Sequence, residues 1–379
     1  MGLVIGIIVG LLILVFLVSV HELGHAIVAR RNGVVVEEFG VGFPPRAWGR
    51  KLKNGTYFTL NWLPLGGFVK LQGENDAADK KGDFGSTTVW QKTKILFAGV
   101  VSNWLVAVVL LTILALVGLP KVLPNQISIP NDTQIITKPV EISSITANYP
   151  ADKAGLKTGD SIIKFAGQDV PTVDGLINNI KNHAGKDVAV VYSRNNSEQS
   201  VNLKLKDNTS GEIFGAGLGQ RESIKATWSA PIVGVLTTAQ FTWVTVQGVG
   251  DLVGGLVHGL VLQFSPVSSV RGQASSELKT VGDSVAGPIG IIGVIFPAAE
   301  RAGLVQLVFL TAIISLTLAV MNILPIPALD GGRWALLVIF KLKKRKLTKE
   351  LEEKIQTIGF TILMGLVILV TIADVAKLF

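Results

Sequence analysis

The sequence predicts a polytopic α-helical membrane protein with about four transmembrane helices, a membrane-associated β loop and one inserted soluble domain. Hydrophobic residues make up 49% of the 379 residues and charged residues only 16%, which is too apolar for an ordinary soluble chain of this length. Long uncharged stretches alternate with segments of ordinary polarity. Part of the chain must therefore lie in the membrane and part in water.

The first predicted transmembrane helix begins at the amino terminus. No residue from Gly2 to Val20 is charged, and ~20 helical residues suffice to cross a hydrocarbon core of ~30 Å. A secretory signal peptide is disfavoured, because no basic segment precedes the apolar stretch and no small-residue cleavage pattern ends it. Arg30 and Arg31 follow the span, so the amino terminus is expected outside and residue 30 onward inside the cell.

The end of this apolar stretch carries the sequence HELGH. His21 and His25 are four residues apart and so share one helix face, where two imidazoles can reach one zinc ion while Glu22 holds a water molecule. Acidic or basic residues near the midplane cost roughly 2.5 to 3.5 kcal/mol each, so such groups persist when they coordinate something. We interpret the HELGH segment as part of the active site of a metal-assisted hydrolase. The alternative is that residues 21–31 are only the polar exit of an anchor helix.

The segment at about 55–72 is expected to form a membrane-associated β loop. Its sequence YFTLNWLPLGGFVKL indicates two short β segments around a Pro and Gly turn, with aromatic residues suited to a membrane interface. An unpaired edge of this loop is a candidate site for a substrate strand. The alternative is an interfacial hairpin that only packs against the helices. The candidate substrate contacts are Phe58, Leu60, Gly66 and Gly67.

Three later apolar stretches complete the predicted spans, at about Ile95 to Leu119, Gly303 to Leu324 and Ile358 to Ala373. The stretch from Pro231 to Leu262 is also apolar, but it is rich in glycine and interrupted by Gln240, Gln247, Asp251 and His258. We therefore favour an amphipathic helix on the outer surface over a fifth span. The basic run at 341–346 is then a cytoplasmic loop facing anionic lipid. It accounts for part of the net charge of +8 without nucleic-acid binding.

Between the second and third spans lies a segment with strand patterns, clearest at 188–192 and 201–206. The string that begins at Tyr149, YPADKAGLKTGDSII, is similar to the bacterial PDZ signature P-A-x-x-A-G-L-x-x-G-D-x-I. The resemblance implies one extracytoplasmic PDZ domain at 125–209. Such domains pair an extended peptide with an exposed strand edge. A spacer without a ligand is the alternative.

A carboxylate that follows the third span completes the candidate metal site. In the segment NILPIPALDGG, two prolines break the helix before Asp330 and two glycines permit close backbone approach after it. Two histidines and a carboxylate leave one tetrahedral zinc position open for water, as catalysis requires. The chain has no cysteine, so any metal must use histidine and carboxylate. A turn or a helix cap is the alternative role of Asp330.

Taken in order along the chain, these motifs resemble the site-2 protease family, and within it the RseP-like bacterial intramembrane zinc metalloproteases. The segments that carry the resemblance are HELGH, the β loop, AGVVSNW, the PDZ segment, AGPIGI and NILPIPALDGG. The resemblance implies that Zn²⁺ is bound by His21, His25 and Asp330. It also implies that Glu22 acts as general base and then as proton donor.

Two asparagines receive roles from the same resemblance. Asn322, in the family's N-x-x-P-x-P-x-L-D-G motif, is expected to contact the substrate or the oxyanion. Asn103, in the position of the family's Gly-x-x-x-Asn motif, is expected either to contribute similarly or to be a helix-packing amide. The chain departs from the RseP pattern because it shows one PDZ segment instead of two in tandem, which weakens the inference of substrate-size filtering.

The resemblance implies a zinc metalloendopeptidase of the bacterial cytoplasmic membrane that performs regulated intramembrane proteolysis, with its active site toward the cytoplasm. It would hydrolyse peptide bonds within or near the transmembrane segment of single-span substrates, such as anti-sigma factors or remnant signal peptides. Two other classes stay open. A membrane-anchored PDZ receptor or chaperone would hold a structural metal, and an ion or metal transporter predicts more discontinuous helices and no peptide-binding domain.

The predicted organisation has four regions. They are an N-terminal membrane domain at 1–119, the PDZ domain at 125–209, an amphipathic outer-surface segment at 225–300 and a C-terminal membrane domain at 301–379.

Overall fold

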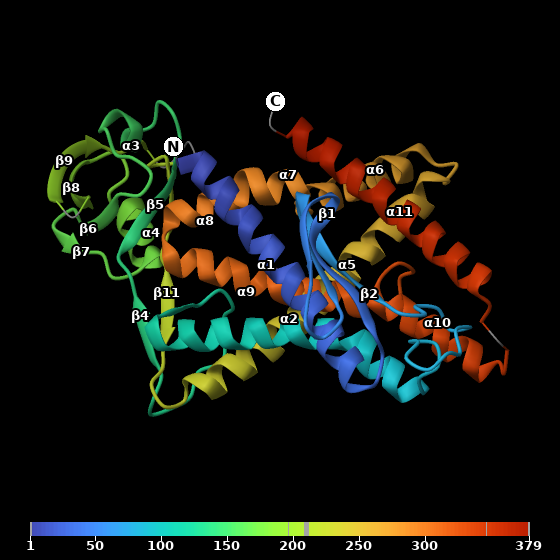
Figure 1. The fold of residues 1–379 in the computed structure, drawn as a ribbon. Coiled ribbons are helices and arrows are strands. Elements are labelled where there is room, and N and C mark those ends of the chain that lie inside the picture. Colours follow the sequence, from blue (N-terminus) through green and yellow to red (C-terminus); the bar gives the residue numbers. More distant parts are fainter. Residues whose placement is uncertain (1, 196, 208–211, 346, 378–379) are drawn as a thin grey trace. The chain divides into compact units, whose positions relative to one another are not determined.

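The computed structural model describes residues 2–195, 197–207, 212–345 and 347–377 (Figure 1). Outside the described residues lie Met1, residues 196, 208 and 209 of the predicted PDZ domain, Lys346 of the basic run and residues 378–379 of the predicted C-terminal domain. The chain forms two compact units. The first comprises Met1–Leu114 with Ala230–Phe379, and the second comprises Ala115–Ser229.

The first unit is built mainly of helices. Five described helices are long and apolar enough to cross a membrane: α1 (Gly2–Arg31), α2 (Val89–Val117), α5 (Ala230–Gln263), α9 (Leu304–Ile323) and α11 (Lys349–Ala376). The shorter helical segments are α6 (Ser268–Ser284), α7 (Pro288–Gly290), a π-helical turn (Ile291–Ile295), α8 (Phe296–Ala302) and α10 (Asp330–Leu342). These long apolar helices fit a polytopic membrane protein, and α1, α2, α9 and α11 overlap the four predicted spans.

Helix α5 differs from the prediction for residues 231–262. By length and composition it is a fifth candidate span, whereas its polar residues predict a surface helix. The first half of α5 packs against α2 and α9. Trp104 Nε1 donates to Thr242 Oγ1 at 3.2 Å, and the rings of Phe241 and Phe309 meet edge to face with centroids 6.0 Å apart. Long-range packing of this kind is not visible in the local pattern of polar residues.

The β loop is larger than predicted, because residues before it form a second long strand. Strand β1 (Val36–Lys51) pairs antiparallel with β2 (Tyr57–Leu71), and both strands bend so that each contributes two segments. The order of the segments across the sheet is 67–71, 36–41, 57–61 and 46–51. Segment 67–71 is therefore an edge, and it lies along the second half of α1 (Figure 1). Strand β1 is not among the elements that the sequence predicts.

The second unit contains a sheet of order β10-β5-β6-β8-β9 with β7 paired to β6, and a smaller sheet of order β3-β11-β4. Its elements are β3 (Leu119–Pro120), β4 (Gln134–Thr137), β5 (Val140–Ile145), α3 (Pro150–Lys153), β6 (Ser161–Phe165), β7 (Gln168–Asp169), α4 (Val173–Asn182), β8 (Asp187–Arg194), β9 (Ser197–Lys204), β10 (Ala216–Gly219) and β11 (Glu222–Lys225). The unit extends past the predicted boundary at 209 because β10 pairs with β5, and β11 with β3 and β4.

The PDZ-like motif forms the turns that lead into β6. Gly155 and Gly159 adopt positive φ angles of 76° and 92°, a conformation that favours glycine. Between this turn and β6 lies Asp160, which is 1% exposed. Its carboxylate accepts hydrogen bonds from Arg194 Nε at 2.7 Å, Arg194 Nη2 at 2.6 Å and the Lys157 backbone N–H at 2.8 Å. The ion pair ties the motif to the end of β8.

Replacing Asp160 with Asn should destabilise the second unit by about 1–3 kcal/mol, because Arg194 would lose its ionised partner. Desolvation raises the pKa of the Asp160 carboxyl, but hydrogen bonds from Arg194 and the Lys157 backbone outweigh it and hold the pKa below its ordinary value. The stabilisation is therefore complete above the unfolded-state pKa of ~3.9 and is lost as the pH falls through the folded-state pKa.

Hydrogen exchange of β6 amides in the full-length protein, measured against pH, checks this expectation. The matched control is Asp169→Asn, since the side chain of Asp169 is 83% exposed and that of Asp160 is 2% exposed. Equal protection of β6 in the two variants would contradict the role assigned to the Asp160 carboxylate.

Candidate metal centre

Helix α1 positions the two histidines of HELGH. Four residues separate them, so both imidazoles leave the same face of the helix one turn apart, and their residues are only 7% and 6% exposed. Helix α2 covers this face at close range. A Cβ atom on Gly24 would lie 2.6 Å from the Ala98 carbonyl oxygen, so only glycine allows the two backbones to approach this closely at that point.

Helix α10 positions the third polar group, because Asp330 is its first residue. Two contacts fix the helix against α2: Trp334 Nε1 donates to Thr93 Oγ1 at 3.0 Å, and the Trp334 ring meets the Phe97 ring edge to face at 5.4 Å. The turn into α10 is tight. A Cβ atom on Gly332 would lie 1.9 Å from the Ile326 carbonyl oxygen, which explains the glycine pair that follows Asp330.

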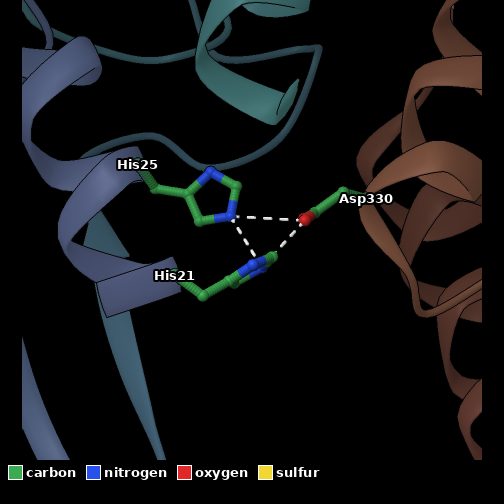
Figure 2. A group of neighbouring side chains, drawn as sticks. All are labelled: His21, His25 and Asp330. Carbon is green, nitrogen blue, oxygen red and sulfur yellow. Dashed lines mark hydrogen bonds and ion pairs between the residues drawn. The ribbon is translucent and has the colours of Figure 1, made fainter. Parts of the chain in front are cut away.

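His21, His25 and Asp330 form a triangle of polar atoms, drawn in Figure 2. Asp330 Oδ2 lies 3.1 Å from His21 Nε2 and 3.3 Å from His25 Nε2, and the two Nε2 atoms are 3.2 Å apart. In a tetrahedral zinc site with ligand bonds of ~2.0–2.2 Å, the ligand atoms lie about 3.3 Å apart. Two imidazoles and one carboxylate at this spacing fit zinc and leave a fourth position open.

Groups behind the histidines orient their rings. His25 Nδ1 lies 2.7 Å from the Ile95 carbonyl oxygen, which requires a proton on Nδ1 and leaves Nε2 free to bind metal. His21 Nδ1 lies 3.5 Å from the fully buried Asn103 amide, whose Oδ1 has no partner among the described residues. Turning this amide by about 180° would let Oδ1 accept the Nδ1 proton that zinc on His21 Nε2 requires.

A cavity of about 800 Å³ reaches the triangle. Glu22, His25 and Asp330 line it together with the 68–71 part of the β2 edge and with charged side chains of α10 and α11. Gly67 lies close to the side chain of Glu22, since a Cβ atom placed on Gly67 would be 3.8 Å from Glu22 Cγ. One cavity therefore combines a candidate metal site, a carboxylate able to move a proton and a strand edge.

A sequence profile of peptidase family M50 matches residues 9–366 of the chain. The chain belongs to this family. A relative from Clostridium acetobutylicum that carries a zinc metalloprotease name is 31% identical, and the match covers 97% of each chain. The regulator of sigma-W protease RasP of Bacillus subtilis is 26% identical, with 96% of each chain covered.

Among solved structures, the PDZ domain of an SdrC-like protein from Listeria monocytogenes is 21% identical to part of the chain. The match covers 24% of this chain and 93% of that domain, with a TM-score of 0.20.

The other site residues that the sequence predicts do not all lie beside the cavity. Of the four predicted contacts in the β loop, Gly67 approaches Glu22, while Phe58 lies in an inner strand segment and stacks on Phe39 with ring centroids 6.1 Å apart. Leu60 also lies in the inner segment, and Gly66 adopts a φ of 148° at the bend of β2.

Neither predicted asparagine lines the cavity in the described part of the chain. Asn103 lies behind His21, and Asn322 lies on the last turn of α9, where its Nδ2 donates to the Leu318 carbonyl oxygen at 3.0 Å. The geometry favours an orienting role for Asn103. The substrate-contacting role of Asn322 stays a prediction.

Gly99 is a site residue that was not predicted from the sequence. A Cβ atom there would lie 2.4 Å from His25 Nε2 and 2.7 Å from His21 Nε2, closer than side chains tolerate. Gly99 therefore opens the space at the two metal-facing nitrogens. The available signal was its position four residues before Asn103, as the first residue of the Gly-x-x-x-Asn pattern.

Replacing Gly99 with Ala should lower zinc affinity by at least about 10-fold, because the new methyl group displaces the imidazoles that it meets. Zinc retention during competition with a chelator measures the effect. Gly248→Ala in α5 is the matched control, since a Cβ atom there meets nothing within 4 Å. Undiminished zinc affinity in Gly99→Ala would mean that this space is not needed for the metal.

Proposed function

We propose that this M50 family member is a zinc-dependent intramembrane protease that hydrolyses peptide bonds within or near the transmembrane segments of its substrates. The observation that carries the proposal is the triangle of the buried His21 and His25 with the partly buried Asp330, which lies among apolar helices and adjoins the cavity that Glu22 lines. Polar groups in such surroundings are costly unless they coordinate something. The zinc metalloprotease names of the relatives agree with this assignment.

His21, His25 and Asp330 would hold the zinc ion, which supplies activation of water and polarisation of a substrate carbonyl when it is bound. Glu22 is the residue placed to move protons. It follows His21 directly in α1 and lines the cavity beside Asp330. Its carboxylate takes a proton from the attacking water and then delivers a proton to the leaving amine, which is the general base and acid pattern of peptide hydrolysis.

The edge segment 67–71 of β2 is the substrate-binding element in this proposal. A helical substrate must unwind before it is cut, because its carbonyl groups are already hydrogen-bonded within the helix. Backbone pairing with an open strand edge replaces the lost hydrogen bonds, which matters where each unpaired group costs several kcal/mol. Residues 68–71 of this edge line the cavity with Glu22, together with Glu37 of β1.

The substrates we propose are single-span membrane proteins, of the anti-sigma-factor or remnant signal-peptide type. The Bacillus subtilis relative carries the name regulator of sigma-W protease RasP, which supports the anti-sigma-factor type of substrate. The PDZ domain that we propose within the second unit would contact peptide or protein outside the cytoplasm. Basic residues lie at the HELGH end of α1 and follow α10. By the positive-inside rule, this supports a metal site toward the cytoplasmic side of a bacterial inner membrane.

Glu22→Gln should lower the cleavage rate by about 10²–10⁴-fold while zinc stays bound, because an amide cannot accept the proton of the attacking water. The measurement uses purified enzyme in liposomes with a single-span reporter that carries a signal-peptide transmembrane segment. Glu350→Gln on the exposed start of α11 is the matched control. Equal cleavage by wild type and Glu22→Gln would favour the receptor or chaperone with a structural metal.

Asp330→Ala should abolish zinc binding that is stoichiometric in the wild-type chain, because two histidines alone cannot complete the site. Metal analysis of the purified, detergent-solubilised protein measures this. The corresponding change at the exposed Asp79 is the control. Zinc content that is unaffected by Asp330→Ala would remove Asp330 from the ligand set.

A further inference from the structure

The loop that leads into Asp330 contains a residue in an unfavourable conformation. Ala328, two residues before the candidate ligand, has a φ angle of 77°, in the left-handed region that a side chain with a Cβ atom rarely adopts. Its backbone N–H donates a hydrogen bond of 2.6 Å to Oε1 of Gln356, which comes from α11. A non-glycine residue stays in this conformation only where its surroundings hold it there.

The orientation of the Gln356 side chain follows from this bond. Because the Ala328 N–H is a donor, the atom that faces it must be the amide oxygen, and Nε2 then points elsewhere. Nε2 is buried and has no hydrogen-bond partner among the described residues. A buried donor without a hydrogen bond destabilises a protein. The unpaired Nε2 therefore gives no stability to α11, and the presence of Gln356 at this place is better explained by its hydrogen bond with Ala328.

Two neighbours on the same face of α11 hold the same loop. Gly359 lies one turn after Gln356, and a Cβ atom on it would be 2.4 Å from Pro327 Cβ and 2.6 Å from the Pro327 carbonyl oxygen. Glu352 lies one turn before Gln356 and is 4% exposed, and its Oε1 pairs with Arg333 Nε at 3.3 Å. The face therefore contacts the segment 327–333 on both sides of Asp330.

We propose that Gln356 is a positioning residue for Asp330: its amide oxygen fixes Ala328 in the left-handed conformation and so sets the path by which the third ligand reaches the histidines. The inference rests on the proposed function, because it assumes that Asp330 binds zinc. It gives the last helix a part in the metal site although that helix contributes none of the three candidate ligands.

Three variants test the assignment in the full-length protein. Gln356→Met keeps the length of the side chain and removes the acceptor, so zinc affinity and kcat should each fall by about 10-fold with KM unchanged. Gln356→Glu keeps an acceptor for the Ala328 N–H and should stay close to wild type. The double variant Gln356→Met with Ala328→Gly should recover most of the loss, because glycine adopts a positive φ without the hydrogen bond.

The readouts are zinc affinity by chelator competition and cleavage of the single-span reporter. Gln306→Met on α9 is the matched control. Wild-type zinc affinity and kcat in Gln356→Met would overturn the proposal, as would failure of Ala328→Gly to rescue, which would indicate general destabilisation of α11. Gln356→Ser, whose side chain is too short to reach Ala328, replaces Gln356→Met if that variant does not accumulate.

The proposed function is tested separately in the same assays. A wild-type chain that neither binds zinc nor cleaves the reporter overturns the function and the inference together. A wild-type chain that does both, beside a Gln356→Met variant that matches it, overturns only the role of Gln356.

Discussion

The approach of the Asp330 carboxylate to both histidines of α1 is the interaction on which the rest of the structure depends. Each of these groups would be costly alone among apolar helices, and together they form a site whose spacing of 3.1–3.3 Å suits one metal ion. The two contributing helices are separated by about 300 residues of sequence, so the site exists only when α1, α2 and α10 pack together.

Close backbone approach makes this packing possible, and glycine is the residue that permits it at each contact. Gly24 lets α1 meet α2, Gly99 clears space at the imidazole nitrogens, and Gly332 tightens the turn into α10. Gly359 brings α11 against the loop before Asp330. A side chain at any of these positions would collide with neighbouring backbone or imidazole atoms, and would shift the groups that form the candidate metal site by the small distances on which metal geometry depends.

The cavity joins the site to the element that would present a substrate. The β2 edge at 67–71 has an open side, and it lines the cavity that Glu22 and Asp330 also line. An open strand edge is ordinarily a liability, because it can pair with any other strand. In the proposed function, the same property would allow an unwound substrate segment to be held in extended form next to Glu22.

The sequence by itself determined the parts that are local. The HELGH spacing, the uncharged stretch before it and the proline and glycine pattern around Asp330 predict a helix, a break and three candidate ligands, because each depends on residues within a few positions. Strand β1, the burial of one end of α5, the space kept open by Gly99 and the contact of Gln356 with Ala328 depend on residues far apart in the chain. No periodicity encodes such contacts, so only the tertiary structure decided them.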